Sequence, residues 1–235
     1  MASTALIQVL GAVAYGEQKA YDKAKEFAEE AVQESTRKMW RTIAAEELRH
    51  HKGFVRRLEA LGADPERAMR PFRASLDHFH GLPPESDEVA QAVVALLGEG
   101  IAADLLTWLR RVADPDTASF IDTVIADEIG HEGRAAAEVR QLMATRPDGR
   151  RRGAQAARNM LVRMASSSPG TGVSFAAFLR LGRAHELVAG IAAGYARRLH
   201  LLGIGPVSTL ERLDPFGIVA RLDPFNAPSR VESAA

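Results

Sequence analysis

The stretches AEELRH (residues 45–50) and DEIGH (residues 127–131) both contain the pattern Glu-x-x-His. On a helix, residues three positions apart lie on one face, so the carboxylate and the imidazole of each pattern can converge on one metal ion. A single copy is ordinary and is explained by a surface salt bridge. Two copies in separate helical segments of one chain favour a metal site.

Helix-bundle proteins that bind two iron or manganese ions combine two such patterns with one glutamate from each of two further helices. The sequence supplies both glutamates. Glu17 lies in VAYGEQ (residues 13–18) and Glu99 lies in LLGEGI (residues 96–101), both otherwise apolar stretches. A carboxylate is costly to bury in such surroundings unless it is paired or binds a metal. We therefore predict that both are metal ligands.

The spacing of these residues supports a single dinuclear site. Glu17 and Glu47 are 30 positions apart, and Glu99 and Glu128 are 29 apart. This indicates two helical hairpins with equivalent positions, related by a pseudo-twofold axis. Glu47 and Glu128 would bridge the two metals, Glu17 and Glu99 would be terminal ligands, and each metal would take one histidine. The full predicted ligand set is Glu17, Glu47, His50, Glu99, Glu128 and His131.

The ligand types restrict the metal. Carboxylates with two imidazoles suit iron, with manganese as the alternative. The chain has no cysteine, which excludes thiolate zinc sites, iron–sulfur clusters, disulfides and cysteine nucleophiles. Six protein ligands for two metals leave open coordination positions, from which we infer activation of O2.

The composition is that of a soluble globular protein, with 46% apolar and 26% charged residues. The 30 basic and 30 acidic residues balance, so net charge gives no argument for a nucleic-acid or membrane partner. Residues 5–15 are apolar but lack the basic leading segment of a secretion signal. We expect a cytoplasmic protein without a membrane partner.

Good helix formers dominate and period-2 alternation is absent, which predicts an all-α fold. We expect a four-helix bundle of the ferritin-like kind, with two extra C-terminal helices and an irregular tail. Prolines between residues 64 and 87 indicate a long crossover connection. The predicted helices cover residues 5–32, 35–61, 87–112, 115–144, 154–165 and 173–202.

The corresponding domains are a helical domain at residues 1–202 and a proline-rich extended tail at 203–235. Within the helical domain, residues 5–145 form the metal-binding bundle and residues 154–202 form the additional helices. The tail repeats RLDPF at residues 212–216 and 221–225. The repeat indicates either two turns that pin apolar side chains onto the bundle or a duplicated docking peptide, with Phe216 and Phe225 as candidate docking residues.

Arginines are concentrated at residues 146–163, where Arg150, Arg151 and Arg152 are candidate RNA contacts. The alternative is a solvated loop and helix face. Tyr21, one helical turn after Glu17, is either a pocket residue or part of the core.

Four charged or polar residues near the motifs fall off the apolar stripes. Asp127 and Glu132 are expected to point outward, and Glu46 and His51 are expected to be solvated or to support the ligands.

Seven segments resemble the bacterial tRNA 2-methylthio-N6-isopentenyladenosine hydroxylase-like (MiaE-like) family of ferritin-like proteins. They are residues 15–17 (YGE), 44–50 (AAEELRH), 62–65 (GADP), 69–72 (MRPF), 76–80 (LDHFH), 98–104 (GEGIAAD) and 126–131 (ADEIGH). The resemblance covers about residues 5–202. It implies an O2-dependent non-haem di-iron hydroxylase that takes electrons from an external donor and acts on tRNA or a small organic substrate.

These features are compatible with three functions. The first is a di-iron monooxygenase of the hydroxylase type. The second is a ferroxidase or oxidant-scavenging ferritin relative, whose substrates are iron and oxidant. The third is a metal-stabilised module whose tail binds a partner. The oligomeric state is left open, with a dimer as one candidate.

Overall fold

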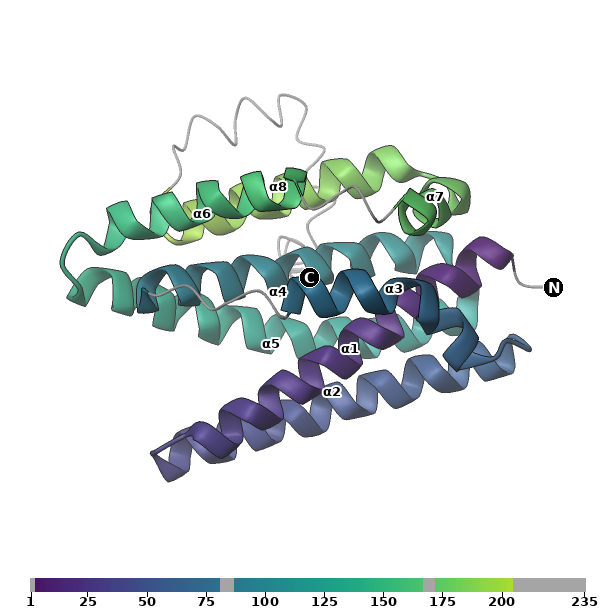
Figure 1. The fold of residues 1–235 in the computed structure, drawn as a ribbon, viewed down its shortest axis with the longest axis horizontal. Coiled ribbons are helices and arrows are strands. Elements are labelled where there is room, and N and C mark those ends of the chain that lie inside the picture. The colour runs from purple at the N-terminus through teal and green to yellow at the C-terminus, as the bar shows by residue number, and fades with distance from the viewer. Residues whose placement is uncertain (1–2, 81–86, 167–171, 205–235) are drawn as a thin grey trace, which may run out of the picture. The chain divides into compact units, whose positions relative to one another are not determined.

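The computed structural model describes residues 3–80, 87–166 and 172–204, so the tail repeat with Phe216 and Phe225 lies outside the described residues. Every regular element in the described ranges is a helix, which confirms the all-α prediction (Figure 1). The helices are α1 (Thr4–Glu30), α2 (Glu34–Ala60), α3 (Pro65–His80), α4 (Glu88–Val112), α5 (Pro115–Thr145), α6 (Gly149–Ser166), α7 (Gly172–Leu181) and α8 (Ala184–Leu201).

The four helices that were predicted to carry metal ligands are α1, α2, α4 and α5, and their ends match the prediction closely. Local signals explain the agreement. The side chain of Ser3 accepts a hydrogen bond from the backbone N–H of Leu6 at the start of α1. Asp87 and Asp114 do the same for Val89 and Thr117 at the starts of α4 and α5.

The connection at residues 64–87 was wrongly predicted as non-helical, because α3 occupies much of it. Pro65 is compatible with a helix, because it stands at the first helical position, where no N–H is needed, and Asp64 caps the N–H of Arg67. Pro71 lies inside the helix, which continues through it. Pro71 removes one helical hydrogen bond, and the free energy gained by burying Met69 and Phe72 offsets this loss.

The C-terminal helices also differ from the prediction. The helix expected at residues 173–202 is two helices, α7 and α8, separated by Gly182 and Arg183. Both residues have left-handed backbone angles, with φ of 102° and 52°. Similarly, α6 begins five residues before its predicted start, directly after Asp148, whose φ is 53°.

The described helices form two compact units, each with its own internal contacts. The first contains α1, α2, α3, α7 and α5 up to Val124. The second contains most of α4, α5 from Ile125 onward, most of α6, and α8.

In the first unit, α1 packs against α2 as a helical hairpin and also against α3 (Figure 1). Gly11 lets α3 approach closely, since a Cβ atom there would lie 2.3 Å from the backbone oxygen of Ala68. The hydroxyl of Tyr15 donates a 2.7 Å hydrogen bond to Asp77 of α3. Burial, together with this contact, raises the pKa of Tyr15 to about 12. These contacts fix α1, and hence Glu17, against its neighbours.

In the second unit, polar contacts tie α6 to α4 and to α8. Arg152 of α6 donates to Asp87, the cap of α4, through a 2.6 Å contact from Nε. The hydroxyl of Tyr195 on α8 donates to the backbone oxygen of Ala157 on α6 at 2.6 Å. Specific hydrogen bonds therefore join α6 to both α4 and α8.

Among the described helices, α4 is long and apolar enough to cross a membrane by length and composition. The core helix of a soluble protein passes the same test, and residues such as Val93, Leu97 and Leu109 of α4 are buried in the structure.

Candidate metal centre

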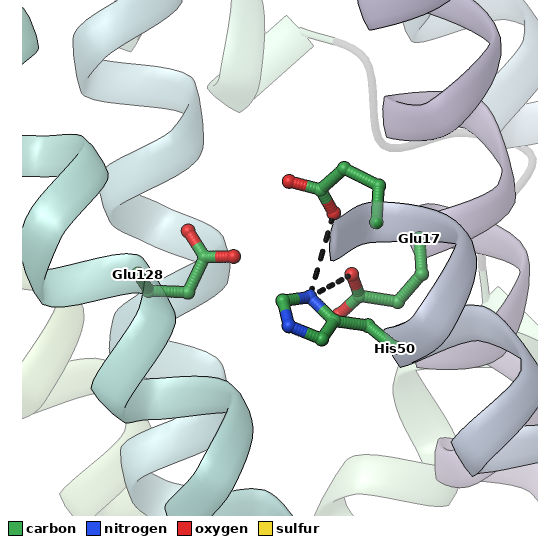
Figure 2. Close-up of side chains that lie close together, drawn as sticks. Glu17, His50 and Glu128 are labelled. Carbon is green, nitrogen blue, oxygen red and sulfur yellow. Dashed lines mark ion pairs between the residues drawn. The ribbon is translucent and has the colours of Figure 1, made fainter. Parts of the chain in front are cut away.

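The first unit brings together Glu17 of α1 with Glu47 and His50 of α2. Their side chains are only 10%, 10% and 2% exposed. The Nδ1 atom of His50 lies 3.5 Å from Oε2 of Glu17 and 3.7 Å from Oε2 of Glu47, as the dashed lines in Figure 2 show. Two carboxylates from different helices thus face one imidazole in a buried position.

The apolar stripe of α2 places Glu47 and His50 there. Phe54 and Leu58 continue the same face and are fully buried, as the spacing of 3 and 4 residues predicted. Phe54 packs edge-on against Phe120 at 4.9 Å between ring centroids. Glu47 and His50 therefore lie on a helix face that is fixed by aromatic packing one turn away.

The electrostatics of the cluster favour a bound cation. Burial raises the pKa of Glu47 to about 7; the hydrogen bond to His50 opposes this rise, and the charge of Glu17 adds to it. Within the part of the chain that the structure describes, neither Glu17 nor Glu47 is paired with a lysine or arginine. Two buried carboxylates without a lysine or arginine partner are costly, and a divalent metal ion would supply compensating positive charge.

The distances agree with this reading. Glu17, Glu47 and His50 each offer a ligand atom, and these atoms lie within 4.8 Å of one another. Oxygen and imidazole nitrogen donors suit iron, manganese or zinc. The three residues therefore fit a metal ion, and their role as ligands stays a prediction.

The second unit contains the other Glu-x-x-His pair, on α5. The Nδ1 atom of His131 lies 3.7 Å from Oε2 of Glu128, the same separation as between His50 and Glu47. The side chains of His131 and Glu128 are 10% and 18% exposed. Both pairs thus adopt one local geometry, and the assignment of the second pair as metal ligands stays a prediction.

Glu99 of α4 differs from Glu17, because it is exposed in the structure. Its apolar surroundings therefore do not place the side chain of Glu99 in the interior. Its neighbours Leu96, Leu97 and Gly100 are buried, whereas Glu99 occupies the remaining, exposed side of the helix. The buried face of such a helix is hard to predict from the sequence, because apolar residues occur on most of its faces. The role of Glu99 as a ligand stays a prediction.

The other candidate residues have mixed surroundings. Tyr21 is half-buried one turn beyond Glu17, and its role in a pocket stays a prediction. Arg150 and Arg151 are exposed, and Arg151 pairs with Asp148 at 2.9 Å. Arg152 is bound to Asp87, so it joins α6 to α4 in addition to any contact with RNA.

Two residues near the motifs have partners that the sequence did not reveal. Glu132 was expected to point outward, but it is 11% exposed and binds Arg197 at 2.8 Å and Arg198 at 3.3 Å. These arginines lie more than 60 positions away, so helical spacing around Glu132 could not indicate them. His51 is half-buried, with Nδ1 2.8 Å from the backbone oxygen of Ala14 on α1.

A helical chain with two Glu-x-x-His pairs, one buried and one half-buried, has the features of the ferritin-like class of metal-binding proteins. A family model described as "Ferritin-like domain, actinomycetes" matches residues 2–173. The chain belongs to this family of ferritin-like domains, which confirms the predicted fold class. No curated protein matches the chain.

Proposed function

We propose that this protein is a di-iron oxidoreductase that uses O2. The ligands would be Glu17, Glu47, His50, Glu99, Glu128 and His131, with manganese as the alternative metal. The observation that carries the proposal is the buried cluster of Glu17, Glu47 and His50, in which no lysine or arginine of the described residues pairs with the two carboxylates. The repeated Glu-x-x-His pair and the ferritin-like family add support.

The residues of the chain would have distinct tasks. Two bound iron ions would supply the redox chemistry with O2. Glu17 and Glu47 would neutralise metal charge, and the buried face of α2 would keep water from the imidazole of His50. Burial raises the pKa of Glu47 to about 7, so metal binding at or below neutral pH would release a proton from this carboxyl group.

The finer assignment is a hydroxylase that resembles the MiaE-like family. The hydroxylase assignment rests on the seven matching segments. We further propose that the protein takes electrons from an external donor and is cytoplasmic. The substrate would be tRNA or a small organic molecule. Exposed Arg150 and Arg151 are available for phosphate contacts at the start of α6.

Consumption of O2 by protein loaded anaerobically with ferrous iron tests this function. With a chemical reductant, a hydroxylase consumes O2 in proportion to added substrate and forms a product one oxygen atom heavier by mass spectrometry. The substrates to compare are unmodified tRNA, prenylated tRNA and the free prenylated nucleoside. A ferroxidase instead consumes O2 only in proportion to added iron. If the iron-loaded protein consumes no O2, the oxidoreductase proposal is wrong.

A further inference from the structure

A buried network of four charged side chains joins α4, α5 and α8 in the second unit. Arg198 of α8 is 1% exposed and holds Asp104 of α4 through two hydrogen bonds, from Nη1 at 2.8 Å and from Nη2 at 3.0 Å. Its Nη2 also lies 3.3 Å from Glu132 of α5. Arg197 binds the other oxygen of Glu132 at 2.8 Å. Two arginines and two carboxylates thus balance each other in the interior.

Two glycines make room for this network in a reciprocal way. A Cβ atom on Gly100 of α4 would lie 1.9 Å from Nε of Arg198, and one on Gly194 of α8 would lie 2.3 Å from Asp104. Each glycine stands four residues before the charged residue of its own helix, and hence on the same face. The two helices therefore meet in one register, with each charged group seated over the other helix's glycine.

The network touches the positions next to three predicted ligands. Gly100, on which the guanidinium of Arg198 rests, directly follows Glu99. Glu132 directly follows His131 and is one turn beyond Glu128. Neighbouring residues on a helix share one rigid backbone. Contacts that hold Gly100 and Glu132 in place therefore also set the position of Glu99 along α4 relative to that of His131 along α5.

We propose that Arg198 is a positioning residue for metal binding, setting the register of α4 against α5 so that Glu99, Glu128 and His131 are presented together. The inference rests on the proposed function, because it assumes that these three residues bind metal. Arg198 lies beyond residues 2–173, which match the family. In this chain, α8 therefore adds a support for the ligand helices from outside the matched region.

The test is a titration of the full-length, metal-free protein with cobalt(II), followed by its visible absorption, alongside urea unfolding of the same samples. Arg198→Lys keeps the positive charge but cannot make the two-point contact with Asp104. We expect it to weaken cobalt binding about 10- to 100-fold, the usual effect of losing a group that orients metal ligands. Gly194→Ala displaces Asp104 while keeping all four charges, and it should weaken binding in the same direction.

The matched control is Tyr195→Phe, which removes another interhelical contact of α8, the 2.6 Å hydrogen bond to the backbone oxygen of Ala157 on α6, a helix without predicted ligands. It should reduce stability to urea without changing cobalt affinity. If Arg198→Lys and Gly194→Ala reduce only stability and leave cobalt affinity at the wild-type value, Arg198 is merely structural and the inference is wrong. If wild-type protein binds no cobalt, or binds it equally well after Glu47→Ala, the proposed function itself fails, and this inference fails with it.

Discussion

The Nδ1 atom of His50 lies 3.7 Å from Oε2 of Glu47, one turn earlier on α2. His131 and Glu128 on α5 show the same atoms at the same separation. The two pairs come from segments with different flanking residues, so their shared geometry follows from the i and i+3 spacing and from partial burial of both helices. Equivalent geometry predicts equivalent contributions to metal binding.

Replacing either histidine should therefore have similar effects. His50→Ala and His131→Ala each remove one imidazole, and each should lower the iron retained after anaerobic loading and desalting by about half or more. Metal analysis by mass spectrometry gives the number of ions per chain. His185→Ala is the control, because His185 is 84% exposed on α8. Full iron content in one variant and none in the other would contradict the equivalence.

Without metal, the buried cluster of Glu17, Glu47 and His50 should lower the free energy of unfolding. Glu47→Gln keeps the shape of the side chain but removes a buried charge beside Glu17. At pH 8, above the raised pKa of Glu47, the free energy of unfolding of metal-free protein should rise by about 1–3 kcal/mol. Iron or manganese should then no longer stabilise the variant. Urea unfolding measures both effects, with exposed Glu59→Gln as the control. A large loss of stability without metal would show that the carboxylate has a structural role instead.

Local periodicity and capping were sufficient to predict much of this molecule. The stripe containing Glu47, His50 and Phe54 could be read from the sequence because it depends on residues one turn apart. Helix α3 was missed because proline was treated as a helix breaker, although Pro65 stands where proline starts a helix. The pairing of Arg198 with Asp104 spans 94 positions, and no local pattern can reveal such a contact.

Close approach of α3 to α1 makes Gly11 sensitive to substitution. A Cβ atom there would meet the backbone of Ala68, which cannot move aside as a flexible side chain can. Gly11→Ala should lower the free energy of unfolding by about 1–3 kcal/mol. At Gly190 of α8, no described atom lies within 4 Å of the added methyl group. Gly190→Ala should raise stability by about 0.5–1 kcal/mol through helix propensity. Equal effects would contradict the α1–α3 contact.

The ion pair between Asp87 and Arg152 should make the free energy of unfolding depend on pH under acidic conditions. The hydrogen bond from Arg152 holds the pKa of Asp87 at about 2, below its ordinary value. The folded state therefore favours the ionised carboxylate, and its stabilising effect is full above about pH 4 and is lost as pH falls toward 2. Asp87→Asn should be less stable than wild type at pH 6, and the gap should close at pH 2. A gap that does not vary with pH would contradict the ion pair.

We propose that this ferritin-like chain binds two iron ions through paired Glu-x-x-His motifs. The most direct measurement is the number of ferrous ions bound per chain at equilibrium, without O2, in wild type, Glu47→Ala and Glu128→Ala. We predict about two ions per chain in wild type and loss of binding in both variants. No bound iron or manganese in wild type, or a single ion indifferent to both substitutions, would contradict it.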